Sequence, residues 1–153
     1  MNLLIALDKK SYQIHQKEML PEGLVLLNQA EEQESKQLVP VPFEELAEKA
    51  GAKITSNTVA AGAALGVLGA PMKLIEKILS NQFRSKGEDI LKKNVKAAEL
   101  GYDAVKDITF KWDFDWKVPE SQPNLIEGSQ ALALGALAGD CRLGAVDPMS
   151  PAT

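Results

Sequence analysis

The sequence predicts an α/β fold that contains a parallel sheet and a helical hairpin. Two short apolar runs, Leu3 to Leu7 and Leu24 to Asn28, are separated by a segment with helical spacing and by a turn. A parallel sheet requires this order of strand, helix, turn and strand, because each parallel strand is reached through a crossover. Apolar residues then recur at three- and four-residue spacing from position 57 to position 105, which is typical of packed helices.

The composition describes a globular chain with few side chains suited to catalysis. The 153 residues have a net charge of -4 and only 5% are aromatic, so the core must be aliphatic. The acidic balance argues against nonspecific nucleic-acid binding. One cysteine, Cys141, and one histidine, His15, exclude an iron–sulfur cluster or a thiolate zinc site held by this chain alone.

No segment of the sequence resembles a targeting or membrane-spanning element. The N-terminal apolar run is too short for a signal peptide, and no small-residue cleavage site follows it. The longest weakly polar stretch, Val59 to Met72, falls short of the roughly 20 residues that a membrane span needs. We therefore expect a cytoplasmic protein with no membrane contact.

The first elements follow from short-range signals. Leu3 to Leu7 is a continuous apolar run, which predicts a strand buried on both faces. Asp8 is the predicted N-cap of a short helix in which Tyr12, His15 and Met19 share one face. A turn follows in which Gly23 is free to take a positive φ, and it leads into the second buried strand.

Proline and glycine set the boundaries of the next elements. The segment Leu38 to Pro42 is predicted to be extended and to lie at a sheet edge, since its two prolines remove ladder donors. Phe43 to Ala50 reads as a short amphipathic helix that ends at Gly51.

Four further helices are predicted along the rest of the chain. Asn57 is expected to cap a helix from Thr58 to Gly69, and Pro71 to open a second one that runs through Phe83. Ser85 and Glu88 have capping-box spacing for the third. Residues 111–123 read as a linker, and an Ala/Leu/Gly helix from about 128 to 138 follows the short run Leu125-Ile126.

Two small-residue patterns predict close helix packing. Gly62 and Gly66 are four residues apart, as are Gly135 and Gly139. Both stretches are too short to cross a bilayer, so we expect tight packing in a core or at a subunit interface. Neither is a phosphate-binding loop, because no P-loop or dinucleotide fingerprint occurs in the sequence.

Four lysines, Lys86, Lys92, Lys93 and Lys96, form a candidate patch for a nucleotide or for an acidic cofactor such as coenzyme A. A solvated helix face is the favoured interpretation, because Glu88 to Lys92 and Asp89 to Lys93 are both i,i+4 pairs in the favourable orientation.

The remaining candidates each have a structural interpretation that we favour. His15 could act as a base, but its spacing predicts a partly buried packing or hydrogen-bonding residue. Cys141 could be a reactive thiol, but it is expected to behave as a small buried hydrophobe. Asp113 and Asp115 could pair for acid–base or metal chemistry, but linker solubility explains them better. The residues alone give no complete catalytic constellation.

Two stretches resemble the 2-oxoacid:ferredoxin (acceptor) oxidoreductases. Asn57 to Gly66, with Leu74 to Leu79 and Ala97 to Tyr102, resembles the C-terminal part of their gamma domain. Leu125 to Cys141, ending in Pro148 to Thr153, resembles the start of their alpha domain. Both in this order resemble the fused gamma–alpha subunit of the 2-oxoglutarate type.

The resemblance implies a division of the chain and a function. Residues 1–110 would be the C-terminal part of the gamma domain, with its parallel sheet incomplete. Residues 111–123 would be a linker, and 124–153 the first strand and helix of a truncated pyrimidine-type domain of a thiamine enzyme. The enzyme would decarboxylate a 2-oxoacid oxidatively to an acyl-CoA and pass electrons to ferredoxin.

The resemblance also places most of the chemistry outside this chain. Thiamine diphosphate, Mg²⁺ and the iron–sulfur clusters would belong to the whole complex, with the beta subunit as partner, and this chain alone would be inactive. Only Ser150 and Thr153 match hydroxyl positions near the thiamine and the substrate carboxylate. Asp147 stands where the family usually has Tyr. The alternative is a non-enzymatic α/β interaction or oligomerisation module, and either would be an oligomer.

Overall fold

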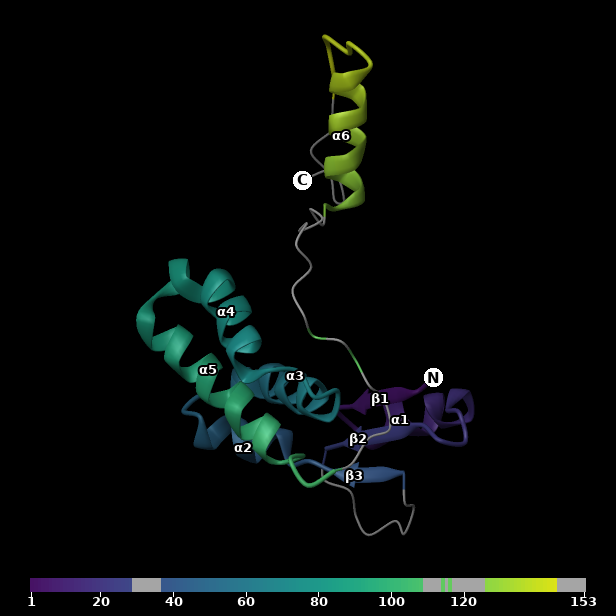
Figure 1. Cartoon of the computed structure of the whole chain (residues 1–153), viewed down its shortest axis with the longest axis vertical. Helices are drawn as coiled ribbons and strands as arrows, with labels where there is room; N and C mark the ends of the chain where they lie inside the picture. Colours follow the sequence, from purple (N-terminus) through teal and green to yellow (C-terminus); the bar gives the residue numbers. More distant parts are fainter. Residues whose placement is uncertain (29–36, 109–113, 115, 117–125, 146–153) are drawn as a thin grey trace. The chain divides into compact units, whose positions relative to one another are not determined.

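The computed structural model describes residues 1–28, 37–108, 114, 116 and 126–145 (Figure 1). Contacts divide the chain into a first unit, 1–116, and a second unit, 117–153. The strands of the first unit are β1 (Leu3–Ala6), β2 (Leu24–Leu27) and β3 (Leu38–Pro40). Its helices are α1 (Lys9–His15), α2 (Phe43–Lys49), α3 (Ser56–Val67), α4 (Met72–Phe83) and α5 (Glu88–Asp103), with 3-10 turns η1 (Gln16–Glu18), η2 (Lys53–Thr55) and η3 (Arg84–Lys86). The second unit contains α6 (Gly128–Ala138).

The three strands form a parallel sheet in the order β1-β2-β3, so the predicted α/β class is confirmed. Every residue of β2 is buried, as expected for a central strand. β3, which ends at Pro40, lies at an edge as predicted. The prediction that β1 is buried on both faces is wrong. Ile5 is 38% exposed, because β1 is the other edge strand and the helices on that face cover only its beginning at Leu3.

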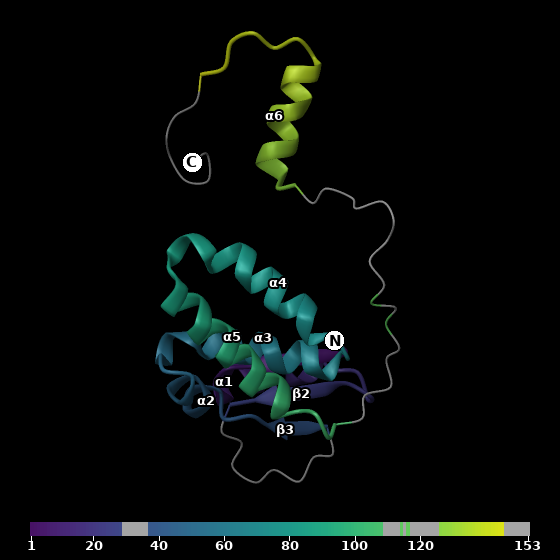
Figure 2. The same cartoon turned by 60° about the vertical axis from the view of Figure 1, so that its left-hand side comes forward.

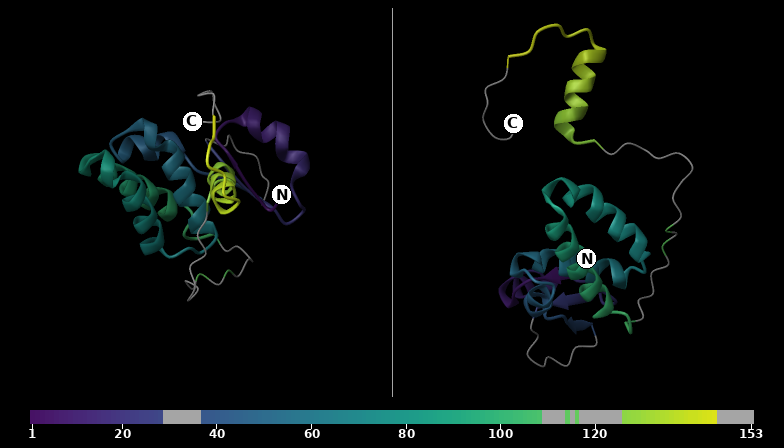
Figure 3. Two further views of the ribbon diagram at one scale, coloured as in Figure 1. Left: turned by 90° about the horizontal axis from the view of Figure 1, so that it is seen from above. Right: turned by 90° about the vertical axis from the view of Figure 1, so that its left-hand side faces the viewer.

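The sheet lies between two unequal layers. Leu24 and Leu26 point into the main core, which α2, α3 and α5 complete. Val25 and Leu27 point the other way, toward Tyr12 of α1 and the turn after it. Figure 3 (left) shows α1 on the opposite side of the sheet from the other helices of this unit, and Figure 2 shows α3, α4 and α5 stacked on the larger side.

The closest packing is between α3 and α5. A Cβ atom added to Gly62 would lie 2.2 Å from the carbonyl oxygen of Ala98, and one added to Gly101 would lie 2.0 Å from that of Val59. Only hydrogen fits in these positions, so the backbones of the two helices touch. The predicted close packing at Gly62 and Gly66 is confirmed, since a Cβ at Gly66 would also meet the Val105 side chain at 2.8 Å.

Not every helix cap that the sequence predicts is found in the structure. Asp8 caps α1 as predicted. Asn57 is not an N-cap, because η2 leads into a helix that already begins at Ser56. The box of Ser85 and Glu88 is absent, because η3 takes up Ser85 and α5 begins after Gly87 at φ +110°. A capping box is found at α6 instead, between Glu127 and Gln130.

Two glycines at chain reversals have different roles. Gly51, after α2, has φ +98°, so it ends the helix as predicted. Gly23 is not among the glycines with positive φ. Its requirement is space, because an added Cβ would lie 2.6 Å from the Met19 Cε atom.

Trp116 contacts the C-terminal end of α3. The indole nitrogen of Trp116 donates a hydrogen bond to the carbonyl oxygen of Leu68 at 3.0 Å, and the Phe114 ring lies 5.9 Å from the Trp116 ring. The Trp116 side chain is therefore tied to the residue that follows α3, and Phe114 lies beside it.

Helix α6 forms where it was predicted, and none of its residues is buried. Leu132 and Leu137 are among its exposed side chains. Of the predicted strand before it, Leu125 lies outside the described residues and Ile126 is not part of a strand. No helix within the described ranges is long and apolar enough to cross a membrane.

Gly62→Ala and Gly101→Ala should each destabilise the first unit by about 1–3 kcal/mol, because a methyl group would force two helix backbones apart. Thermal melts followed by circular dichroism measure this change. Gly135→Ala is the matched control. Among the described residues, and apart from the backbone of its own helix, no atom lies within 4 Å of a Cβ at that position, so helix propensity should favour alanine by about 0.5–1 kcal/mol. A melting temperature unchanged by Gly101→Ala would contradict the close contact.

The exposed leucines of α6 predict fast amide exchange in dilute solution, because none of the residues of this 11-residue helix is buried among the described residues and isolated helices of that length are marginal in water. Protection should appear on self-association or on addition of a partner chain. Hydrogen exchange at several protein concentrations tests this, and strong protection that does not change with concentration would refute it.

Candidate functional site

A cavity of about 590 Å³ lies among η2, α3, α4 and α5. Its volume is within the range typical of small-molecule sites. The helices that form it are held by the α3–α5 contact and by Ile75 and Leu79, which pack α4 onto Ala98. The lining residues are Ala52, Ile54, Thr55, Asn57, Thr58, Ala61, Leu79, Gln82, Phe83, Lys86, Ile90, Lys93 and Asn94.

A buried hydrogen-bond network holds one wall of the cavity. Asn94 of α5 is buried, and its Oδ1 accepts a hydrogen bond from Thr58 Oγ1 of α3 at 2.8 Å. Its Nδ2 donates to the Ile90 carbonyl oxygen at 2.9 Å. Buried Thr55 donates from Oγ1 to the Ala52 carbonyl at 2.7 Å. Because these polar groups are satisfied, they fix the wall rather than strain it.

The predicted solvated lysine face is confirmed for the pairs along α5. Lys92 lies 3.6 Å from Glu88, Lys93 lies 2.6 Å from Asp89, and Lys96 lies 3.2 Å from Glu99, counted between Nζ and a carboxylate oxygen.

Two of the four lysines also line the cavity, which the sequence did not predict. Lys93 belongs to the lining in addition to its ion pair, and Lys86 places its Nζ 5.3 Å from the centre of the Phe83 ring. The lining contains no carboxylate.

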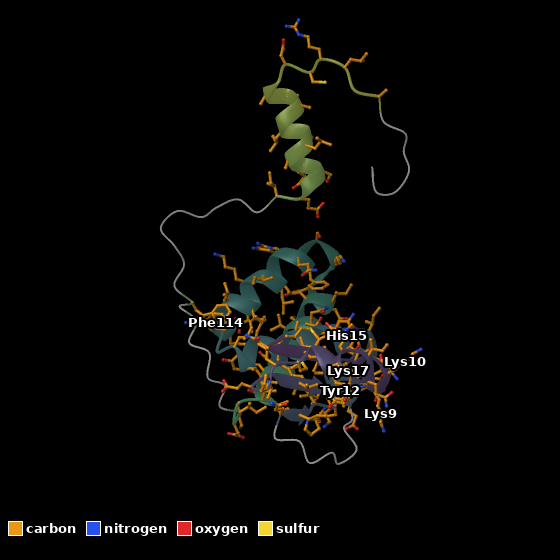
Figure 4. All side chains as sticks on the ribbon, turned by 90° about the vertical axis from the view of Figure 1, so that its right-hand side faces the viewer. Lys9, Lys10, Tyr12, His15, Lys17 and Phe114 are labelled. Carbon is orange, nitrogen blue, oxygen red and sulfur yellow. The ribbon has the colours of Figure 1, made fainter. Side chains whose placement is uncertain are left out.

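His15 takes the structural role that was predicted for it. Its Nδ1 lies 2.9 Å from Glu18 Oε1, and the side chain is 46% exposed, so it is a partly buried hydrogen-bonding residue. Figure 4 shows it with Tyr12 and with the lysines of this segment, Lys9, Lys10 and Lys17.

Two charged groups have shifted proton affinities, and both shifts are local. Hydrogen bonds from the backbone amide and hydroxyl of Ser11, at 2.7 and 2.9 Å, lower the pKa of Asp8. The hydrogen bond to Glu44, at 2.7 Å, raises the pKa of Lys53. Neither residue lines the cavity, so these shifts belong to helix capping and surface pairing.

The other candidates lie elsewhere or outside the described residues. The prediction that Cys141 is buried is wrong. It is exposed and lies in the polar turn after α6, next to the ion pair of Arg142 with Asp140 at 3.0 Å. In the described ranges, no three His, Cys, Asp or Glu side chains are grouped to hold a metal. The candidates outside the described residues are Asp113, Asp115, Asp147, Ser150 and Thr153.

Residues 1–104 match the family model described as pyruvate ferredoxin/flavodoxin oxidoreductase, and the chain belongs to this family.

A solved structure shares the fold. It is a 2-oxoglutarate:ferredoxin oxidoreductase from Magnetococcus marinus, determined with 2-oxoglutarate, coenzyme A and succinyl-CoA bound. The TM-score is 0.76 at 22% identity, over 99% of this chain and 28% of that one. The present chain therefore spans less than a third of the length of that protein.

Asp8→Ala should lower the melting temperature at neutral pH, because the carboxylate caps α1. Since folding lowers the pKa of Asp8, its contribution is present above the ordinary carboxyl pKa. It is lost as the pH falls through the ordinary value and then the folded one. The difference between wild type and Asp8→Ala should therefore shrink on acidification.

Asp8→Asn is the matched control for that titration, because an amide oxygen also accepts at an N-cap but does not titrate. A wild-type advantage over Asp8→Ala that persists at low pH would refute the assignment of the shift to this cap.

Proposed function

We propose that this chain is part of a 2-oxoacid:ferredoxin oxidoreductase, which decarboxylates a 2-oxoacid oxidatively to an acyl-CoA and passes electrons to ferredoxin. Membership of the family over residues 1–104 is the observation that carries this proposal. The fold shared with a 2-oxoglutarate:ferredoxin oxidoreductase supports it. The 2-oxoglutarate type is the favoured substrate class.

Within such an enzyme we assign the chain to a fused gamma–alpha subunit. Residues 1–110 would be gamma domain, 111–123 a linker, and 124–153 the start of the alpha domain. The glycine-rich stretch that resembles the gamma domain includes Gly62 and Gly101, the residues at which α3 and α5 touch. The assignment is supported because the sequence features behind the resemblance build the main packing contact.

The contribution of the chain is structural, and the chemistry belongs to its partners. One cysteine cannot supply the thiolates of a cluster, and the described residues offer no grouped metal ligands. We therefore assign thiamine diphosphate, Mg²⁺ and the iron–sulfur clusters to a beta subunit and the rest of the complex. Bound thiamine diphosphate supplies the carbanion chemistry. Ser150 and Thr153 are the hydroxyls of this chain proposed to lie near it and near the substrate carboxylate.

A second candidate function is a non-enzymatic oligomerisation module. The exposure of Leu132 and Leu137 on α6 favours it, because apolar helix surface of this kind is usually covered by another chain. The two candidates differ in the partner that they require, which is a thiamine-binding subunit in the first and a second copy of this chain in the second.

The chain alone should show no 2-oxoacid-dependent reduction of a viologen dye, even with thiamine diphosphate, Mg²⁺ and coenzyme A. Turnover above a blank without protein would contradict the assignment of the chemistry to partners. Co-expression with a thiamine-binding beta subunit encoded beside it should give a stable complex, detected by size-exclusion chromatography with mass analysis.

If the chain does not bind the beta subunit and elutes as a homo-oligomer, this result would favour the non-enzymatic oligomerisation module instead. Leu137→Glu, which adds a charge to α6, should weaken either association. Lys92→Gln changes a solvated residue of the first unit and serves as the matched control.

A further inference from the structure

The cavity between α3, α4 and α5 carries an uncompensated positive charge. Its lining holds two ammonium groups and no carboxylate. Lys93 is neutralised by Asp89 at 2.6 Å. Lys86 makes no ion pair with any residue that the structure describes, and the Phe83 ring, 5.3 Å from Nζ, is its neighbour in the cavity wall. One cation therefore remains available to an anion from outside the chain.

The same cavity exposes apolar surface at its mouth. Ile54, in η2, is 90% exposed, and Ile90 of α5 is 42% exposed. Leu79 and Ala61 add further apolar lining. Removing such surface from water is favourable by roughly 25 cal/mol for each Å². A ligand with an apolar body would therefore gain affinity by covering Ile54 and Ile90 while its charge meets Lys86.

We propose that this cavity binds an amphipathic carboxylate, a molecule with an apolar chain and a single anionic headgroup. The carboxylate pairs with Lys86 Nζ, and the chain lies against Ile54, Ile90 and Phe83. A nucleotide fits less well. The lining contains neither arginine nor a glycine-rich loop to surround a polyphosphate, and one free ammonium balances one negative charge.

Decanoate, kept below its critical micelle concentration, is the probe, and binding to the full chain is measured by isothermal titration calorimetry. We expect saturable binding with one ligand per chain. Decanol, which has the same chain without the charge, should bind about tenfold more weakly, the effect of one charged hydrogen bond. Lys86→Gln should reduce that preference to little or nothing.

Two matched controls separate the site from general effects. Lys92→Gln removes a lysine of α5 that does not line the cavity, and it should leave decanoate binding unchanged. Ile54→Ser should weaken both ligands, whereas Ile78→Ser, at an exposed isoleucine outside the lining, should not. Both isoleucines are exposed, so neither change removes a core contact.

No saturable binding to the wild-type chain would overturn the proposal. Equal affinities for decanoate and decanol, or an equal loss in Lys86→Gln and Lys92→Gln, would also overturn it. Because the assay involves no partner subunit or turnover, these outcomes are independent of whether the chain belongs to an active oxidoreductase.

Discussion

The contact between α3 and α5 is the constraint on which the first unit depends. Gly62 and Gly101 let two backbones approach until a carbonyl oxygen occupies the place of each missing side chain. This contact brings α5, far along the chain, against the helix that covers the sheet. The core then closes between Leu26 of β2 and Ala63 and Ala97 of the two helices. Small residues at these positions allow a core with few aromatic side chains to pack densely.

The cavity is a consequence of the same geometry. The two helices touch at the glycines, and toward the start of α5 the Thr58–Asn94 hydrogen bond links them, with α4 and η2 forming the remaining walls. The arrangement of α3 and α5 thus produces both the close glycine contact and the cavity beside it. Any change that moves α5 also moves Ile90 and Lys93, which line the cavity.

Local sequence patterns predicted most of the helices and strands but fewer of the tertiary contacts between them. The central strand, the edge strand with Pro40, the cap at Asp8 and the bounds of α6 follow from local periodicity and capping chemistry. The exposure of Ile5 could not be foreseen, because it depends on how far a layer of distant helices reaches. The packing role of Gly101 has no local signal, because its partner lies about forty positions earlier in the chain. The exposure of Cys141 likewise depends on its surroundings in the fold, which the local sequence pattern does not specify.

The candidate site was predictable only in part. The concentration of positive charge at the four lysines was evident in the sequence, and the predicted i,i+4 ion pairs of Lys92 and Lys93 are present. The role of Lys86 depends on Phe83 and on residues of η2 and α3, which folding alone brings together. A single exposed isoleucine such as Ile54 carries little signal in a sequence, because isolated apolar residues are common on surfaces.

The hydrogen bond between Trp116 and Leu68 has a consequence for tryptophan fluorescence. An indole whose nitrogen is bound to the end of α3 occupies a fixed environment, and it enters water when that end opens. Its emission therefore reports the integrity of a region 48 positions away in the sequence. In a Trp112→Phe variant, where Trp116 is the one remaining tryptophan, fluorescence can follow the opening of that helix end without an added label.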